Sequence, residues 1–500
     1  MLKKVRISLA TVFFTFITLL FLDFTGTLHT WFGWMAKIQF LPAVLAFNMV
    51  IIVLLVLLTL LLGRVYCSVI CPLGVFQDIV ARIGRKVKRL HYSFSPEKTL
   101  LRYGVFAVYV AAVIFGAGAI IALLDPYAAY GRMAANFLLP VWQQGNNLLA
   151  LLAERVDSYA FYTTDIWMKS LPAFIIAAVT LVIVAGLALR NGRIYCNAIC
   201  PVGTLLGFLS RFSLFQIRID EHKCNKCNRC VRNCKSACID GKTSKVDNSR
   251  CVRCMNCIEK CTNDAIAYKS GYPKSVLSKT DQAQKVDEVR KGFFVAIMLL
   301  ATSSIKAQII PKAIDVKPDG GLADILDKKS PNRLTSLSPA GSLSAKNMRR
   351  NCTACQLCVT TCPNGILRPS ASLETFMQPL MSYERGYCRP ECVKCSEVCP
   401  AGAIRKITKE EKSSTQIGHA VWVRERCIPL TDGQTCDNCE RHCPTKAIMM
   451  IPSVAGDEQS LQIPAVNEEL CIGCGACEYL CPARPLSAIY VEGHQIHKFI

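Results

Sequence analysis

Closely spaced cysteines constrain this chain more than any other feature of its sequence. Twenty-nine of the 500 residues are cysteines, and in most cases only two or three residues separate one from the next. An odd total in such short runs argues against a disulfide framework and indicates metal ligation. Two early runs are Cys224-x2-Cys227-x2-Cys230-x3-Cys234 and Cys251-x2-Cys254-x2-Cys257-x3-Cys261. This is the spacing of a ferredoxin that holds two [4Fe-4S] clusters.

In such ferredoxins the fourth cysteine of each run ligates the cluster of the other run. Cys238 is left over by this rule, and we expect it to be a packed thiol without a ligand role. Zinc is the competing metal, but paired zinc sites lack the third cysteine of each run. The expected ligand sets are Cys224, Cys227, Cys230 and Cys261 for one cluster, and Cys251, Cys254, Cys257 and Cys234 for the other.

Four further runs in the last third of the chain predict four more clusters by the same exchange. Two of them depart from the standard spacing, with three residues after Cys388 and eight after Cys427 before the next cysteine. Ala403-Ile404, Ala447-Ile448 and Ala488-Ile489 should begin the short strand of each ferredoxin half. The expected ligand sets are Cys352, Cys355, Cys358 and Cys399; Cys388, Cys392, Cys395 and Cys362; Cys427, Cys436, Cys439 and Cys481; and Cys471, Cys474, Cys477 and Cys443.

The first part of the chain is apolar enough to lie in a membrane. No A-x-A-like cleavage site follows the first apolar segment, which favours a transmembrane helix over a cleaved signal peptide. A basic stretch after the second segment (Arg82, Arg85, Lys86, Lys88 and Arg89) should lie in the cytoplasm by the positive-inside rule. Segments of about twenty apolar residues can cross a bilayer, and we expect four spans, at 7–22, 41–62, 100–124 and 171–189.

A duplicated motif ends the second and fourth of these segments. Gly63-Arg-Val-Tyr-Cys-x3-Cys-Pro-Leu-Gly and Gly192-Arg-Ile-Tyr-Cys-x3-Cys-Pro-Val-Gly match in register, which indicates an internal repeat. Cysteines at i and i+4 share one helix face, and the following proline breaks the helix. The alternative is that these cysteines are small buried hydrophobic residues. The repeat favours a redox, quinone or metal site on Cys67, Cys71, Cys196 and Cys200, with Arg64, Tyr66, Arg193 and Tyr195 as further candidate groups.

A polar linker separates the first ferredoxin pair from the later ones, and it contains one apolar stretch. Arg290-Lys291-Gly292-Phe293-Phe294 and the residues after it are similar to a twin-arginine export signal with lysine as the second basic residue. The apolar stretch is short for a span and typical of a signal region. Export would place 310–500 in the periplasm, with 216–289 on the cytoplasmic side. The alternative is an internal helix that leaves every cluster in the cytoplasm.

Charge and missing motifs exclude several other functions. The net charge of +22 is reduced by the clusters, since each oxidised four-thiolate cubane carries about −2. No basic stripe is interleaved with stacking aromatics, so nucleic-acid binding is not expected. The sequence has no CxxCH haem site, no GxGxxG opening a helix after a strand, and no P-loop. We therefore expect an electron-transfer component rather than a stand-alone catalyst.

The duplicated Cys-x3-Cys-Pro motif, followed by a two-cluster ferredoxin, resembles the NapH-type membrane iron–sulfur proteins. The region from Arg290 onward resembles the NapG-type ferredoxins, so the chain looks like a fusion of the two. The resemblance implies that electrons pass from membrane quinol to a periplasmic reductase. It also implies that Cys67, Cys71, Cys196 and Cys200 correspond to the family's membrane motif. The flavin-attachment domain of the related NosR-type regulators has no counterpart here.

The expected architecture is a membrane α-helical domain of four spans, with a fifth if 290–309 crosses, joined to α+β two-cluster ferredoxin-like domains. The domains are 1–215 in the membrane, 216–270, a linker at 271–348, and then 349–410 and 411–500. The expected function is an electron relay in the bacterial cytoplasmic membrane with six [4Fe-4S] clusters, in contact with lipid, the quinone pool and a redox partner protein. An assembly factor that supplies electrons or metal to another metalloenzyme is the alternative, and a redox sensor is a third class.

Overall fold

The computed structural model describes residues 2–88, 92–158, 160–270, 318–319, 323–324 and 326–500. These residues divide into two units, one made of Met1–Gly271 with Lys328–Ile500 and the other of Tyr272–Asp327. In the second unit only the hairpin of β5 (Pro318–Asp319) and β6 (Ala323–Asp324) is described. The expected signal-like or fifth transmembrane segment at 290–309 lies outside the described residues.

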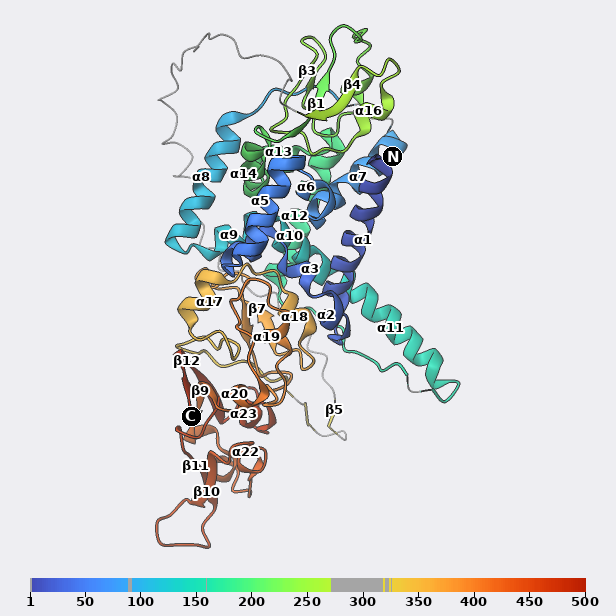
Figure 1. Ribbon diagram of the computed structural model, residues 1–500. Coiled ribbons are helices and arrows are strands. Elements are labelled where there is room, and N and C mark those ends of the chain that lie inside the picture. The colour runs from blue at the N-terminus through green and yellow to red at the C-terminus, as the bar shows by residue number, and fades with distance from the viewer. Residues whose placement is uncertain (1, 89–91, 159, 271–317, 320–322, 325) are drawn as a thin grey trace. The chain divides into compact units, whose positions relative to one another are not determined.

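Two helices have the length and composition of a membrane span. Helices α1 (Leu2–Leu22) and α12 (Leu171–Asn191) contain 21 residues each and coincide with the first and fourth expected spans (Figure 1). At 1.5 Å per residue each is about 30 Å long, which matches the hydrocarbon core of a bilayer. Within the described ranges no other helix meets the same length and hydropathy criteria.

The second and third expected spans are interrupted, so the expectation of four continuous spans is wrong. The second is split into α4 (Phe40–Leu45) and α5 (Met49–Leu62), because Phe47 has a φ of 51° and ends the first helix. The third is split into α8 (Thr99–Phe115) and α9 (Gly118–Leu124) at Gly116, whose φ is 71°. Hydropathy continues across both points, but a residue in the left-handed region cannot continue an α-helix.

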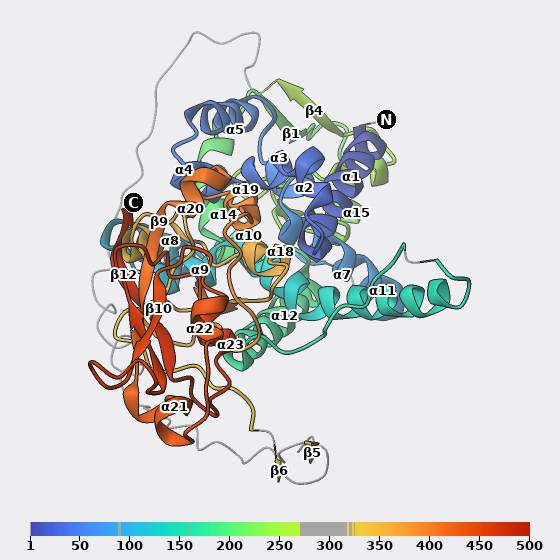
Figure 2. The same cartoon turned by 90° about the horizontal axis from the view of Figure 1, so that it is seen from below.

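Part of the segment between the third and fourth expected spans is buried helix. Helix α10 (Pro126–Met133) begins at Asp125, whose carboxylate accepts from the Ala128 amide at 3.0 Å, and all its residues are buried. A π-helical turn, η1 (Ala134–Leu138), leads into α11 (Leu139–Glu154). Both views show α11 leading away from the other helices (Figures 1 and 2).

Short helices connect the longer ones. Between α1 and α4 lie α2 (Thr27–Phe32) and α3 (Trp34–Lys37). Each Cys-x3-Cys-Pro motif forms a short helix and then a longer one that begins at the proline. These are α6 (Tyr66–Val69) and α7 (Pro72–Lys88) in the first repeat, and α13 (Ile194–Ala198) and α14 (Pro201–Ser210) in the second.

Residues 215–270 form the first ferredoxin module. Its outer strands, β1 (Phe215–Ile219) and β4 (Ile266–Ser270), pair antiparallel, and β2 (Ile239–Asp240) pairs with β3 (Lys245–Val246). Two short helices, α15 (Arg229–Arg232) and α16 (Asn256–Lys260), complete it. Ile217, Ile239 and Ile266 pack with the cysteines in its core.

The C-terminal region forms a second and a third ferredoxin module. The second contains α17 (Ala345–Asn351), α18 (Leu357–Thr361), α19 (Lys394–Val398), α20 (Lys409–Ser413) and the hairpin of β7 (Leu367–Pro369) with β8 (Pro379–Met381). The third contains β9 (Thr415–Trp422) paired with β12 (Ile489–Phe499), β10 (Ile448–Pro452) paired with β11 (Gln462–Val466), η2 (Arg424–Arg426), α21 (Ile428–Thr431), α22 (Asn438–Arg441) and α23 (Ala476–Leu480).

Strands begin at Ile448 and Ile489 as expected, whereas Ala403-Ile404 lies in a bend. The last part of the expected linker is not a free connection, because residues from Lys328 onward pack on the third module. Arg333 forms a buried ion pair with Glu478 and donates to the Val491 carbonyl at 2.7 Å. A buried ion pair of this kind fixes a segment that composition alone would describe as a tether.

Candidate iron–sulfur sites and the paired membrane motifs

The first module brings its expected ligands together in two groups. Cys224, Cys227, Cys230 and Cys261 line one cavity, although the last follows the others by more than thirty residues. In the other group, burial raises the pKa of Cys257, and the neighbouring thiols of Cys254, Cys251 and Cys234 raise it further. Both groupings contain the exchanged fourth cysteine.

Cys238, which the sequence left without a role, lies beside two expected ligands. Its sulfur is 3.6 Å from that of Cys234, and the residue is buried. A hydrogen bond from the Cys238 thiol lowers the pKa of Cys251. A thiol in this position can donate hydrogen bonds to cluster-bound sulfurs, which is one way a protein tunes the potential of a cluster.

The second module contains two further groups of expected ligands. Burial raises the pKa of Cys358, and so do the neighbouring thiols of Cys352, Cys355 and Cys399. Burial likewise raises the pKa of Cys395, followed by the thiols of Cys388, Cys362 and Cys392. The extra residue after Cys388 does not separate it from its expected partners.

The third module shows how the wide gap after Cys427 is accommodated. Cys427 precedes α21, and this short helix returns the chain so that Cys427, Cys436, Cys439 and Cys481 line one cavity. The remaining group is also close together. Burial raises the pKa of Cys474, and the neighbouring thiols of Cys471 and Cys443 raise it further. Burial also raises the pKa of Cys477, as do the thiols of Cys474 and Cys471.

The second and third modules meet at their ligand loops. The Cys388 amide donates to the Cys474 carbonyl at 2.9 Å, and the Tyr383 hydroxyl donates to the Gly473 carbonyl at 2.7 Å. Cys388 and Cys474 belong to different expected clusters. A direct main-chain hydrogen bond between ligands of two clusters would give electrons a short path from one cluster to the other.

The spacing of these groups suits clusters better than single ions. Among the described residues, no three histidine, cysteine or acidic side chains lie close enough together to hold one metal ion. A cubane distributes its four thiolate ligands over four separate irons, so its ligands need not converge on one point. The buried, mutually close thiols therefore fit [4Fe-4S] clusters.

The two Cys-x3-Cys-Pro motifs are clamped to each other by an exchange of arginines. Arg64 of the first motif donates to the Cys196 carbonyl of the second at 3.0 Å. Arg193 of the second motif donates to the Cys67 carbonyl of the first. Both guanidinium groups are fully buried. The motif glycines permit this arrangement, because a Cβ at Gly74 would meet Arg193 and Cys67, and a Cβ at Gly203 would meet Arg64 and Cys196.

All four motif cysteines are buried, and several have hydrogen-bond donors aimed at sulfur. Gln77 Nε2 lies 3.3 Å from the sulfur of Cys196, and Arg64 Nη2 lies 3.9 Å from that of Cys67. Cys200 is the N-cap of α14, and its sulfur accepts from the Gly203 amide at 3.3 Å. Amide and guanidinium donors stabilise thiolates, which are the form of cysteine that binds metal. The site therefore fits an anionic metal cluster.

The arginine and tyrosine groups of the motifs already have protein partners. Arg64 also bonds Asn197 and the Ser249 carbonyl, and Arg193 bonds Asp78. Tyr66 donates to Gln39 at 3.0 Å, and Tyr195 donates to the Leu124 carbonyl at 3.5 Å. These groups hold the motifs and the first module in place, and their expected contact with quinone remains a prediction.

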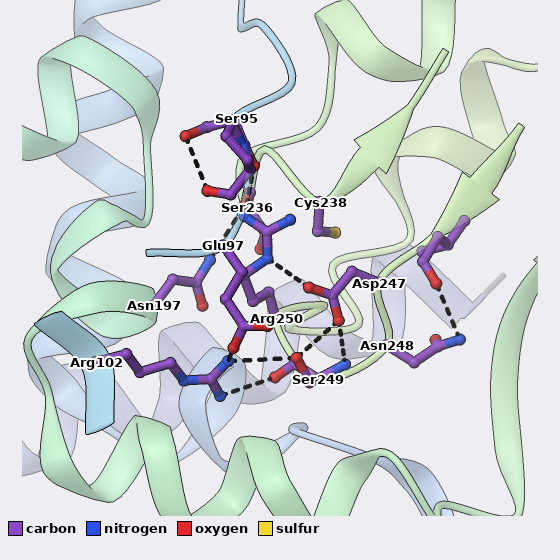
Figure 3. Close-up of polar contacts among 12 residues, drawn as sticks. Ser95, Glu97, Arg102, Asn197, Ser236, Cys238, Asp247, Asn248, Ser249 and Arg250 are labelled. Carbon is purple, nitrogen blue, oxygen red and sulfur yellow. Dashed lines mark hydrogen bonds and ion pairs between the residues drawn. The ribbon is translucent and has the colours of Figure 1, made fainter. Parts of the chain in front are cut away.

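Sequence reasoning missed the polar groups that join the motifs to the first module. Asn197 donates to the Ser236 carbonyl at 3.1 Å, Arg102 bonds Glu97 and Ser249, and Arg250 bonds Asp247 (Figure 3). One residue could have predicted these contacts. Arg102 is a charged residue within an expected span, and burying such a residue costs free energy unless it is paired.

Comparisons with known proteins match the Cys-x3-Cys-Pro motifs and the ferredoxin modules separately. A family described as a 4Fe-4S binding domain matches residues 44–91 and 171–219, and each segment contains one Cys-x3-Cys-Pro motif. A family described as a 4Fe-4S dicluster domain matches 426–484. The methylamine utilization ferredoxin-type protein MauM of Methylorubrum extorquens is 32% identical over 182 residues, which are 34% of this chain and 80% of that protein. The chain belongs to the family of ferredoxin-type [4Fe-4S] proteins that includes MauM.

Other ferredoxin-type relatives cover similar lengths. NapF of Escherichia coli K12 is 27% identical over 180 residues, 36% of this chain and 100% of NapF. NapG of the same strain is 30% identical over 155 residues, 29% of this chain and 65% of NapG. No solved structure matches. Electron transfer through multiple [4Fe-4S] clusters is thus a property of this ferredoxin-type family, and the likeness covers about a third of the chain.

Proposed function

We propose that this protein is a membrane-bound relay that carries electrons from quinol through [4Fe-4S] clusters to a redox partner protein such as a periplasmic reductase. In this proposal the N-terminal part is of the NapH type and the C-terminal part of the NapG type. The first module lies on the cytoplasmic side of the bacterial cytoplasmic membrane, and the second and third lie in the periplasm.

The observation that carries the proposal is that the first and second ferredoxin modules contact opposite ends of both membrane-length helices. At the start of α1, Lys3 pairs with Glu259 of the first module. Just beyond the end of α1, the Thr25 carbonyl accepts from Lys394 of the second module at 2.7 Å. Helix α1 is about 30 Å long between these contacts, which is the thickness of a bilayer core.

Helix α12 repeats this arrangement in the opposite direction. Before its start, Lys169 donates to the Val359 carbonyl of the second module at 2.6 Å. Beyond its end, the Arg193 amide donates to the Lys235 carbonyl of the first module at 2.8 Å. Cluster-bearing modules at both ends of two antiparallel spans are what a relay across a membrane requires.

The paired motifs would provide a further redox centre between the modules. They adjoin the first module through Arg64 and the Ser249 carbonyl, which are 3.1 Å apart. Toward the second module, Tyr195 contacts the Leu124 carbonyl just before α10, and the position of Gly131 on α10 lies against the Cys355 carbonyl. A seventh cluster on Cys67, Cys71, Cys196 and Cys200 would lie on this buried route.

Quinol-driven reduction of the clusters tests the proposed function. Membranes containing the full chain would be mixed with a short-chain quinol, frozen at set times and examined by EPR. The relay predicts signals of reduced [4Fe-4S] clusters that disappear when an oxidant is added. Clusters that dithionite reduces but quinol does not would contradict quinol as the donor and favour the assembly-factor alternative.

A further inference from the structure

The two cysteine groups of the first module differ in their exposure to solvent. The inner group is wholly buried and consists of Cys234, Cys251, Cys254 and Cys257. The outer group reaches the surface, with Cys227 exposed and three partly exposed members, Cys224, Cys230 and Cys261. Because electron transfer between proteins needs a short distance, a diffusing partner would reach this module through the outer group.

Positive charge surrounds the outer group. Lys223, Lys226 and Arg229 line the same cavity as its cysteines, and all three are exposed. We call these three residues the basic rim. Asp240 is the one acidic residue of the lining, and its carboxylate accepts from the Lys242 amide and the Thr243 hydroxyl. The cavity lined by Cys427 in the third module, by contrast, has no lysine or arginine in its lining.

The basic rim has no role in holding the fold together. Among the described residues, its three side chains form no ion pair and no hydrogen bond. The segment 223–229 is hydrogen-bonded only within the first module, as when the Cys227 amide donates to Asn225 at 3.3 Å and Asn233 donates to the Arg229 carbonyl at 2.9 Å. The charges of the rim are therefore available to a partner.

A short path joins the outer group to the paired Cys-x3-Cys-Pro motifs. Cys230 of the outer group and Cys234 of the inner group are three residues apart, in and just after the short helix α15. Lys235 follows Cys234, and its carbonyl accepts from the Arg193 amide of the second motif at 2.8 Å. An electron that enters at the basic rim can thus pass from the outer group to the inner group and on to the motifs.

We propose that the basic rim is a docking surface for a small acidic ferredoxin, which delivers electrons to the outer group. The direction rests on the proposed function, because in that relay electrons leave through the second and third modules and the first module must then be an entry. The docking surface adds a soluble protein as a second electron donor beside quinol.

Charge and position together favour an acidic electron carrier over other anions. An anionic lipid or a nucleic acid would also be attracted to lysine and arginine, but neither gains from an exposed cysteine group. Complementary charge brings two redox proteins together quickly and in the right orientation. Their complexes are short-lived and bury less than about 1,200 Å², so a few exposed charges beside the outer group suffice.

One electron passes in each encounter. The reduced ferredoxin is oxidised by one unit, and the cluster of the outer group is reduced by one unit, with no bond formed or broken and no proton transferred. The electron then moves through the inner group and the paired motifs to the second and third modules, and finally reduces the oxidised partner protein.

The first test measures binding of a purified acidic [2Fe-2S] ferredoxin to the full chain in nanodiscs of neutral lipid. We expect binding that weakens as salt is added, because salt screens exposed charges. Arg229→Glu should weaken binding several-fold and leave the EPR signals of dithionite-reduced clusters unchanged. Lys269→Glu is the matched control, since Lys269 is an exposed residue of the same module that does not line the cavity, and it should bind like the wild type.

The second test follows the electron. Reduced ferredoxin is mixed with the oxidised full chain and frozen at set times, and its EPR signal should disappear as [4Fe-4S] signals appear, several-fold more slowly in Arg229→Glu.

Three results would overturn the docking surface: no binding or no electron transfer, binding that salt does not weaken, or equal losses in Arg229→Glu and Lys269→Glu. Binding of anionic lipid vesicles that Arg229→Glu abolishes, with ferredoxin binding unchanged, would assign the rim to lipid and also overturn it. None of these results changes the reaction with quinol. Clusters that ferredoxin reduces but quinol does not would overturn quinol as the donor and support this surface.

Discussion

At the scale of single residues, Asp78 connects three parts of the molecule. Its buried carboxylate lies 2.9 Å from Arg193 of the second motif, 3.2 Å from Lys235 of the first module and 3.3 Å from Arg6 of α1. Burial alone would raise the pKa of Asp78, but Arg193 and Lys235 hold the pKa well below its usual range. The aspartate therefore stays charged and offsets cations that would otherwise be buried without a partner.

Asp78→Asn should destabilise the protein strongly. Breaking a buried ion pair by removing one partner costs about 3–5 kcal/mol, because the remaining charges stay buried. Thermal denaturation in detergent would measure the loss. Glu374→Gln is the matched control, since Glu374 pairs with Arg349 at an exposed position, where such pairs contribute about 0–1 kcal/mol. Equal losses in the two variants would contradict the role given to Asp78.

His497 should make the third module sensitive to acid. Burial lowers the pKa of His497 to about 4, and the charge of His494 acts in the same direction. Between that value and the ordinary pKa near 6.5, the unfolded chain binds more protons than the folded one, so stability falls as pH falls. The loss reaches about 3 kcal/mol at the acidic end of this range.

Hydrogen exchange of the β9–β12 amides in the full chain measures this effect. Comparing wild type with His497→Gln at each pH cancels the intrinsic pH dependence of exchange. We expect protection in the wild type to fall from pH 6.5 to 4 and to fall less in the variant. Parallel curves would show that His497 does not carry the effect.

At the scale of elements, the exchanged arginines explain why each motif contains a glycine two residues after its proline. Gly203→Ala should displace Arg64 from the Cys196 carbonyl, because the added methyl group would meet both. Overpacking of this kind costs about 1–3 kcal/mol, and we expect a lower Tm and loss of metal from the motif site. Gly186→Ala in α12 is the control, since nothing lies within 4 Å of the added atom. A larger effect at Gly186 would contradict the clamp.

At the scale of the whole molecule, six ferredoxin clusters require about 24 irons, and a seventh at the paired motifs raises this to about 28. The double variant Cys67→Ser, Cys200→Ser should therefore lose about four irons and retain the ferredoxin EPR signals. Iron and acid-labile sulfide analysis of purified protein would measure this. An unchanged iron content would show that the motif cysteines hold no cluster.

The grouping of cysteines is the part of the structure that local sequence predicts best, whereas their roles as cluster ligands remain predictions. Cysteine spacing predicts which thiols lie close together, and even after the wide gap Cys427 lines one cavity with Cys436, Cys439 and Cys481. The interruptions of two spans could not be read from average hydropathy, since Phe47 is apolar yet has a positive φ. Burial of α10 and the docking of Arg333 depend on residues more than a hundred positions away, which no local pattern reports.

The position of the C-terminus relative to the membrane tests the central claim most directly. Alkaline phosphatase and a fluorescent protein that matures only in the cytoplasm would be fused separately after Ile500, with matching fusions after Ser270 as controls. The relay predicts phosphatase activity without fluorescence at Ile500, and the reverse at Ser270. Fluorescence at both positions would place every cluster on the cytoplasmic side and contradict electron transfer across the membrane.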